Sequence, residues 1–134
     1  PNTGHLKLAE IMNKKKDTHL ITQNVDNLHQ DSGIDNSQIT ELHGNATYAK
    51  CLDCSKKYEL DSLKNAFLSS KEPPFCNDCG GIIKTATISF GQAMPEEEMI
   101  TAQRFSIKSD LFICLGSSLA VFPAADLPLL AKNL

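Results

Sequence analysis

Two pairs of cysteines impose the strongest constraint on how this chain folds. The two motifs are Cys51-x-x-Cys54 and Cys76-x-x-Cys79, with 21 residues between them. Four thiolates at this spacing suit a tetrahedral Zn²⁺ ion. A disulfide framework is the alternative, but two Cys-x-x-Cys pairs are awkward as disulfides and natural as metal ligands. The spacing therefore predicts a four-cysteine zinc site that divides the chain into a metal-held insert and two flanks.

Composition and charge limit the class of protein. With 134 residues, 41% hydrophobic and 22% charged, the chain is expected to form a globular fold. Its net charge of −3 argues against a surface that binds nucleic acid. No apolar run approaches the roughly 20 residues of a membrane span, so no membrane association is expected. The start is polar and lacks both a signal peptide and Met. We expect an excerpt of a longer cytoplasmic protein whose thiols stay reduced.

The hydrophobic pattern predicts helices and strands in alternation. Helices are expected at 3–16, at 95–105 and after Pro123, where Pro128 would interrupt the tail. A further helix, capped by Asp61 and packed through Leu63 and Phe67, is expected to end before Pro73-Pro74. Strands are expected at 18–22, 39–42, 87–90 and 110–115. The run 110–115 is the most convincing strand, and Cys114 within it reads as a buried free thiol. This order predicts an α/β fold with a parallel sheet, whose ligands bind at the carboxyl ends of its strands.

Polar residues follow two of the predicted strands. Gln23, Asn24 and Asp26 come directly after the first, and their amides and carboxylate suit a ligand rich in hydroxyls and amides. An ordinary turn would explain them equally well. Gly116-Ser117-Ser118 follows the run 110–115 and would cradle a phosphate or a ribose, although a turn or helix cap explains it as well. His43, before a glycine, is either a structural loop residue or a general base.

The ordered set of motifs resembles the sirtuins, the NAD-dependent protein-lysine deacylases. The matching segments are Thr22-Gln-Asn-Val-Asp-Asn-Leu-His29, Glu41-Leu-His-Gly44, the two Cys-x-x-Cys motifs, Phe90-Gly91, Gly116-Ser-Ser-Leu119 and Pro123-Ala-Ala125. The resemblance implies part of a Rossmann-like parallel sheet with helices, formed by residues 1–45 and 86–134, that carries a small four-cysteine zinc-ribbon insert at 46–85. It also implies that the family's first strand and glycine-rich NAD loop precede residue 1, and that a later strand follows Leu134.

The resemblance assigns roles near the reacting ribose. Gln23 and Asn24 would contact the nicotinamide ribose of NAD, and Asn24 would also help to place a water. Asp26 would line the nicotinamide pocket, and His43 would be the general base. The implied reaction moves an acyl group from a protein lysine to ADP-ribose, which gives nicotinamide and an O-acyl-ADP-ribose.

The resemblance also implies where the acylated peptide, the rest of NAD and the zinc bind. Phe90 would wall the acyl-lysine tunnel, and Gly91 and Val121 would clamp the peptide as an added strand. The NAD ribose and phosphates would lie along Gly116, Ser117 and Ser118. The four cysteines would hold a zinc that does no chemistry, because four thiolates leave no open position for water.

Two other functions fit the same residues. One is a non-catalytic zinc-ribbon module that recruits protein or nucleic acid, although basic and aromatic residues are not interleaved around the motifs as nucleic-acid binders require. The other keeps the sirtuin fold but transfers ADP-ribose to a protein acceptor, with the same first chemical step.

Overall fold

The computed structural model describes residues 1–15 and 17–132, which form two compact units. The first unit comprises Pro1–Gln23, Leu28–Leu42 and Ala93–Leu134, and the second comprises Asn24–Asn27 and His43–Gln92. The backbone therefore passes from one unit to the other four times. Each unit has its own hydrophobic core.

The first helix of the first unit is confirmed. Helix α1 spans Thr3–Lys14, and its predicted continuation to Lys16 ends at a residue outside the described ones. Asn2 is the N-cap, and its side-chain oxygen accepts a hydrogen bond from the His5 backbone N–H at 3.1 Å. Ala9 and Met12 are buried with Ile34, so one face of the helix is covered as its apolar spacing predicts.

The predicted parallel sheet is also present. Strands β1 (Leu20–Thr22) and β2 (Ile39–Glu41) pair in parallel, with Leu20 opposite Ile39. The chain between them includes helix α2 (Leu28–Asp31) and a 3₁₀ turn, η1 (Asn36–Gln38). Helices in a connection of this kind are typical of parallel pairs.

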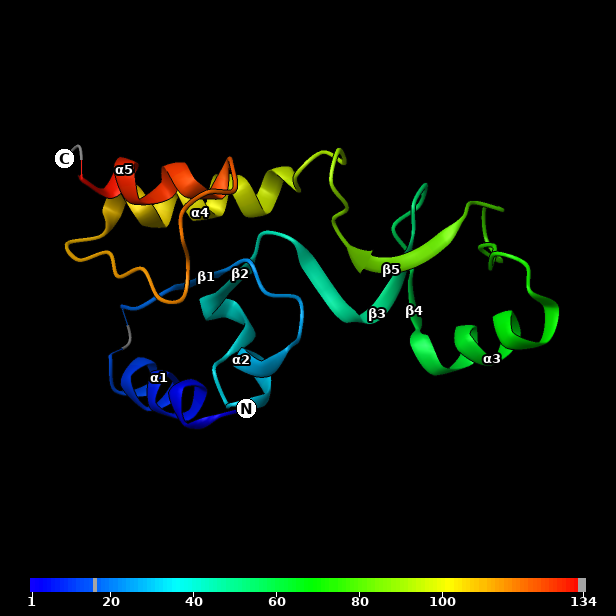
Figure 1. Ribbon diagram of the computed structural model, residues 1–134, viewed down its shortest axis with the longest axis horizontal. Coiled ribbons are helices and arrows are strands. Elements are labelled where there is room, and N and C mark those ends of the chain that lie inside the picture. Colours follow the sequence, from blue (N-terminus) through cyan, green and yellow to red (C-terminus); the bar gives the residue numbers. More distant parts are fainter. Residues whose placement is uncertain (16, 133–134) are drawn as a thin grey trace. The chain divides into compact units, whose positions relative to one another are not determined.

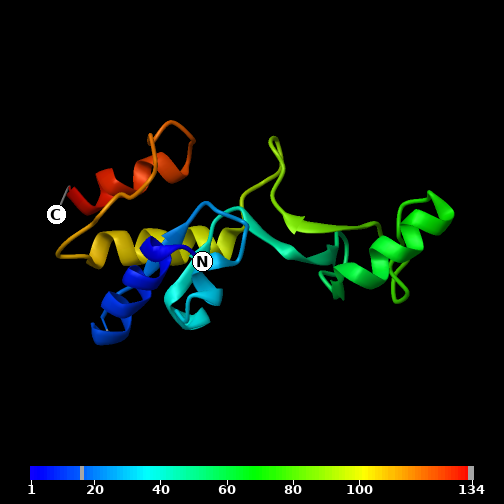
Figure 2. The same ribbon diagram turned by 60° about the horizontal axis from the view of Figure 1, so that its bottom comes forward.

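The C-terminal part of this unit is helical. Helix α4 spans Glu96–Lys108, as Pro95 and the acidic first turn predict, and packs against α5 (Leu127–Lys132) (Figures 1 and 2). The 3₁₀ turn η2 (Ala124–Asp126) leads directly into α5. Pro128 does not interrupt this tail, because it lies in the first turn of α5, where a missing N–H costs little. The core between these helices contains Leu42, Ala102, Ala124 and Leu127.

The strand predicted at 110–115 is absent, and this prediction was wrong. Leu111, Ile113 and Leu115 are exposed by 75%, 65% and 71%, and only Phe112 packs against the core. A strand requires a hydrogen-bonded neighbour, and within the described residues this segment pairs with no strand. The prediction that Cys114 is buried fails for the same reason, since its side chain is exposed.

The second unit contains an antiparallel sheet of three strands. Its order is β4 (Lys57–Glu59), β3 (Gly44–Cys51) and β5 (Ile83–Thr87), and helix α3 (Leu60–Ser70) follows β4. The sequence pattern missed β3 because its buried side chains are Asn45, Ala49 and Cys51, none of which is a large hydrophobic residue. The core of this unit consists of Ala49, Cys51, Cys76 and Ile83, with Tyr58, Leu60 and Leu63 packed against it.

Two local predictions in this unit need correction. The strand expected at 87–90 lies earlier, at Ile83–Thr87, because Ile83 pairs with Cys51 at the end of β3. Asp61 does not cap α3: the N-cap is Glu59, so Asp61 lies in the first turn. Leu63 packs against the core as expected, whereas Phe67 is 45% exposed. The helix ends before Pro73-Pro74, with Lys71 in the left-handed conformation.

Among the described residues, no helix is both long enough and apolar enough to cross a membrane.

Gly44 should be intolerant of any side chain. Its φ is +73°, and a Cβ would lie 2.0 Å from the carbonyl oxygen of Ala86, which belongs to the backbone of β5. We expect Gly44→Ala to lower the unfolding free energy by at least about 2 kcal/mol, from backbone strain and the clash together. Chemical denaturation measures this loss, and Gly91→Ala is the control because its φ of +83° adds the strain without a clash. Equal losses in the two variants would contradict the role of the close contact.

Candidate functional site

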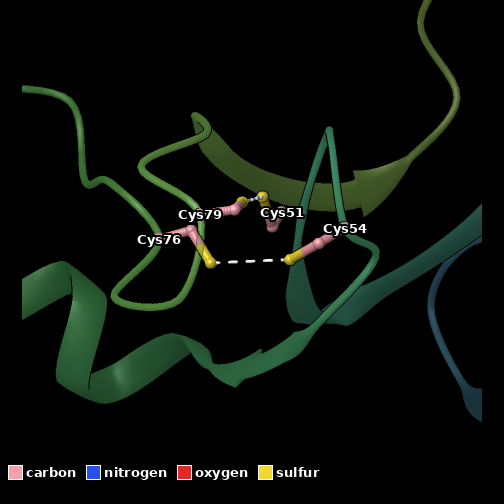
Figure 3. Close-up of side chains that lie close together, drawn as sticks. All are labelled: Cys51, Cys54, Cys76 and Cys79. Atoms are coloured by element: carbon pink, nitrogen blue, oxygen red, sulfur yellow. Dashed lines mark hydrogen bonds between the residues drawn. The ribbon is translucent and has the colours of Figure 1, made fainter.

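The four cysteines converge as the spacing predicts. Their Sγ atoms all lie within 4.8 Å of one another. The Sγ atoms of Cys51 and Cys79 are 3.5 Å apart, and those of Cys54 and Cys76 are 3.6 Å apart (Figure 3). All four cysteines are free thiols. Sulfurs about 2.3 Å from one tetrahedral ion would lie about 3.8 Å apart, so these distances fit Zn²⁺ and exclude the ~2 Å bond of a disulfide.

Neighbouring side chains hold the two cysteine motifs in place. The Tyr58 hydroxyl donates to Cys76 Sγ at 3.1 Å and lowers the pKa of that thiol to about 6. Lys56 and Asp78, one beside each motif, form an ion pair at 2.7 Å. A Cβ on Gly81 would lie 2.8 Å from Cys51 Sγ, so only glycine leaves room for the sulfur there. The spacing of the cysteines did not reveal Tyr58 or Lys56 as supporting residues.

Residues 24–27 are held against the start of β3. The Ala46 backbone N–H donates to the Val25 carbonyl oxygen at 2.7 Å, and the Asn45 side-chain amide donates to Asn27 Oδ1 at 2.9 Å. Asn45 is only 2% exposed, and its own Oδ1 accepts from both the backbone N–H and the hydroxyl of Thr47, at 2.8 and 2.7 Å. Asn27 has a φ of +63°, a conformation that asparagine tolerates better than most residues. These contacts fix the backbone that carries Asn24 and Asp26.

His43 immediately precedes β3 and is partly buried. Its carbonyl oxygen accepts a hydrogen bond from the Ile88 backbone N–H at 2.9 Å, and Gly44 pairs with Thr87. The segment that begins at Ile88 leads to Phe90 and Gly91, so this contact joins two of the motifs that the sequence singled out. Three segments that contain motif residues, 24–27, 43–46 and 88–91, thus meet in the second unit through hydrogen bonds.

The other predicted site residues lie in the first unit. They are Gln23, Gly116, Ser117, Ser118 and Val121. Within its own segment, the Ser117 hydroxyl accepts from the Leu119 backbone N–H at 3.2 Å, and the Val121 carbonyl oxygen accepts from Ala125 N–H at 3.0 Å. These local bonds are those of a turn, so the NAD role of this segment stays a prediction.

Sequence reasoning assigned no role to three groups that support the motif segments. They are Asn45, Lys84 and the side chain of Gln92. Asn45 directly follows the matched Glu41-Leu-His-Gly44 segment, which was the available signal. No pattern in the sequence indicated the contacts of Lys84, because its hydrogen-bond partners lie up to eight residues away in a turn.

Comparison with known proteins gives a consistent result. The model of the Sir2 family matches residues 1–123. An NAD-dependent protein deacetylase of Rhodopseudomonas palustris is 48% identical over 99% of this chain, which covers 53% of the relative. An NAD-dependent protein deacylase of Pyrococcus furiosus is 39% identical over 99% of the chain and 53% of the relative.

Solved structures of other proteins also have a similar fold. A structure described as Sir2 with a p53 peptide and NAD⁺ has a TM-score of 0.88 at 38% identity, over 99% of this chain and 54% of that one. A Sir2 structure bound to a propionylated peptide also has a TM-score of 0.88, and 55% of it is covered. The chain belongs to the Sir2 family. It spans about half the length of the relatives it matches.

Removal of one zinc ligand should unfold the second unit. We expect Cys76→Ser to lose bound zinc and at least about 2 kcal/mol of unfolding free energy, because metal binding supplies folding energy to so small a core. Elemental analysis and thermal unfolding measure both quantities. Cys114→Ser is the matched control, since Cys114 lies outside the cluster. Wild-type zinc content in Cys76→Ser would show that this sulfur is no ligand.

Asn45→Ala should loosen residues 24–27. The substitution removes the donor to Asn27 and the acceptor for Thr47, so we expect a loss of about 2 kcal/mol in stability. The Ala46 amide, which donates to Val25, should also exchange with solvent faster. Hydrogen exchange read by NMR measures this, with the exposed Asn65→Ala on α3 as control. Unchanged exchange at Ala46 would mean that Asn45 does not hold the segment.

Proposed function

We propose that this chain forms the catalytic part of an NAD-dependent enzyme that removes acetyl or other acyl groups from protein lysines. The observation that carries the proposal is the meeting of segments 24–27, 43–46 and 88–91, because each of them contains residues that match one of the family's motifs. The relatives named as NAD-dependent deacetylases and deacylases support the same reaction class.

Each segment has a proposed task. Gln23 and Asn24 bind the nicotinamide ribose, Asn24 orients a water, and Asp26 lines the nicotinamide pocket through its carboxylate. Gly116, Ser117 and Ser118 bind the ribose and phosphates of NAD through backbone N–H groups and hydroxyls. Amide, carboxylate and hydroxyl groups of this kind match the hydrogen-bonding groups of a dinucleotide.

His43 is the proposed general base. Its imidazole accepts a proton from a ribose hydroxyl, which then receives the acyl group. Before this proton transfer, the acyl carbonyl oxygen attacks the anomeric carbon of the NAD ribose and nicotinamide leaves. The ribose hydroxyl then attacks the resulting imidate, and water completes the cleavage of its carbon–nitrogen bond. The products are free lysine, nicotinamide and an O-acyl-ADP-ribose. Because the acyl group moves to ADP-ribose while the acyl-lysine amide is cleaved, the enzyme is formally a transferase as well as a hydrolase.

An acylated-lysine peptide is the proposed partner. Phe90, which is fully exposed, would wall the tunnel for the acyl chain, and Gly91 and Val121 would pair with the peptide backbone. Relatives have been solved with acetylated and propionylated peptides, which supports an acyl-lysine substrate.

The zinc is proposed to be structural. Cys51 ends β3 and His43 immediately precedes it, so an eight-residue strand separates them by roughly 25 Å. Four thiolates also leave no open position for a substrate or water. We assign residues 46–85 to the zinc-binding part and residues 1–45 and 86–134 to the NAD-binding part. Zinc-binding thiolates also favour a reducing compartment, and a cytoplasmic location is proposed on that basis.

His43→Ala should abolish deacylation. Loss of the general base is expected to lower kcat/KM at least about 100-fold, with zinc content and folding unchanged. Mass spectrometry of an acetyl-lysine peptide incubated with NAD and the complete protein that contains residues 1–134 measures the products. His5→Ala on α1 is the control and should keep wild-type turnover.

The same experiment separates the competing functions. Deacetylated peptide with O-acetyl-ADP-ribose, lost in His43→Ala, supports the proposal. ADP-ribose attached to the acceptor without deacylated lysine would replace it with ADP-ribosyl transfer. Full turnover in the variant would refute the role of His43.

A further inference from the structure

Residues 89–92 form a tight turn that presents Phe90. The Gln92 backbone N–H donates to the Ser89 carbonyl oxygen at 2.9 Å, which closes the turn. Gly91 occupies the third position with a φ of +83°, which is typical of a type II turn. Phe90, at the second position, is fully exposed. The side chain of Phe90 therefore contributes no burial that would hold the turn in shape.

The amino group of Lys84 contacts both ends of this turn. Lys84 lies on β5, and its Nζ donates to Gln92 Oε1 at 3.1 Å and to Ser89 Oγ at 3.3 Å. A third bond, at 2.5 Å, goes to the carbonyl oxygen of Thr87, where β5 ends. An ammonium group has three donors, and each has one acceptor here.

Gln92 completes the arrangement. Its Oε1 accepts from the Ser89 backbone N–H at 3.2 Å as well as from Lys84, so one oxygen joins the turn's first residue to the ammonium group. Hydrogen bonds from a charged donor are stronger than those between neutral groups. The bonds from Lys84 therefore connect the turn to the side chain of a residue in the sheet.

We propose that Lys84 is a positioning residue that holds the Phe90-Gly91 turn in the conformation that receives the acylated peptide. The inference rests on the proposed deacylase function, and it adds Lys84 and Gln92 to the residues that determine peptide binding. A turn fixed in advance spares the peptide the entropic cost of ordering it. Loss of the contact should therefore weaken peptide binding more than it slows the chemical step.

Lys84→Met tests this in the complete protein that contains these residues. We expect KM for an acetyl-lysine peptide to rise about 10-fold, with kcat within about 2-fold and zinc content unchanged. Lys84→Arg should restore a KM near wild type, because arginine keeps the donors. Lys57 on β4 is a lysine of the same sheet, so Lys57→Met is the matched control and should leave KM and kcat unchanged.

Gln92 provides an independent check on the same contact. Gln92→Ala should raise KM similarly, and the Lys84→Met/Gln92→Ala double variant should be little worse than either single one, because both remove one interaction. Gln92→Glu keeps the acceptor and should keep the wild-type KM. Additive losses in the double variant would overturn the proposal.

Hydrogen exchange decides the structural part without any activity. Lys84→Met should accelerate exchange at the Ser89 and Gln92 amides, while the Cys51 and Ile83 amides of the sheet stay protected. Unchanged exchange, or an unchanged KM in an active protein, would overturn the proposal. If the unsubstituted protein shows no deacylation, the proposed function fails, and the exchange result still decides whether Lys84 holds the turn.

Discussion

The pairing of β3 with β5 is the constraint on which the second unit depends. At one end of β3, Cys51 pairs with Ile83 and contributes a sulfur to the cysteine cluster. At the other end, Gly44 approaches β5 so closely that no side chain fits, and the adjoining His43 is hydrogen-bonded to Ile88. One strand thus joins the metal site to the segments proposed for catalysis.

The small core of this unit explains why a metal at the cysteine cluster would matter to its stability. Two of its four buried residues, Cys51 and Cys76, are cysteines of the cluster, and the other two are Ala49 and Ile83. Burial of so little apolar surface offsets only part of the chain entropy lost on folding. Four metal–sulfur bonds would supply what the hydrophobic effect does not. Tyr58 packs on the core while its hydroxyl contacts a sulfur.

The motif segments are held by polar contacts rather than by regular structure. Residues 24–27 depend on the buried amide of Asn45, and the turn at 89–92 depends on the ammonium group of Lys84. Both supports come from side chains in the sheet of this unit. A rigid scaffold that holds irregular segments in this way is common in enzymes, because loops can present backbone groups and side chains in geometries that helices and strands do not allow.

The sequence alone determined the cysteine cluster, the family resemblance, α1, α4 and the parallel pair of strands, because each depends on motif spacing, on local capping or on the order of helices and strands. Only the tertiary structure decided the rest. The run 110–115 was apolar enough for a strand but pairs with no strand in the described chain, whereas the polar strand β3 forms because β4 and β5 flank it. Asn45 meets Asn27 across 18 residues, and such contacts have no local signature, since chain folding chooses the partner.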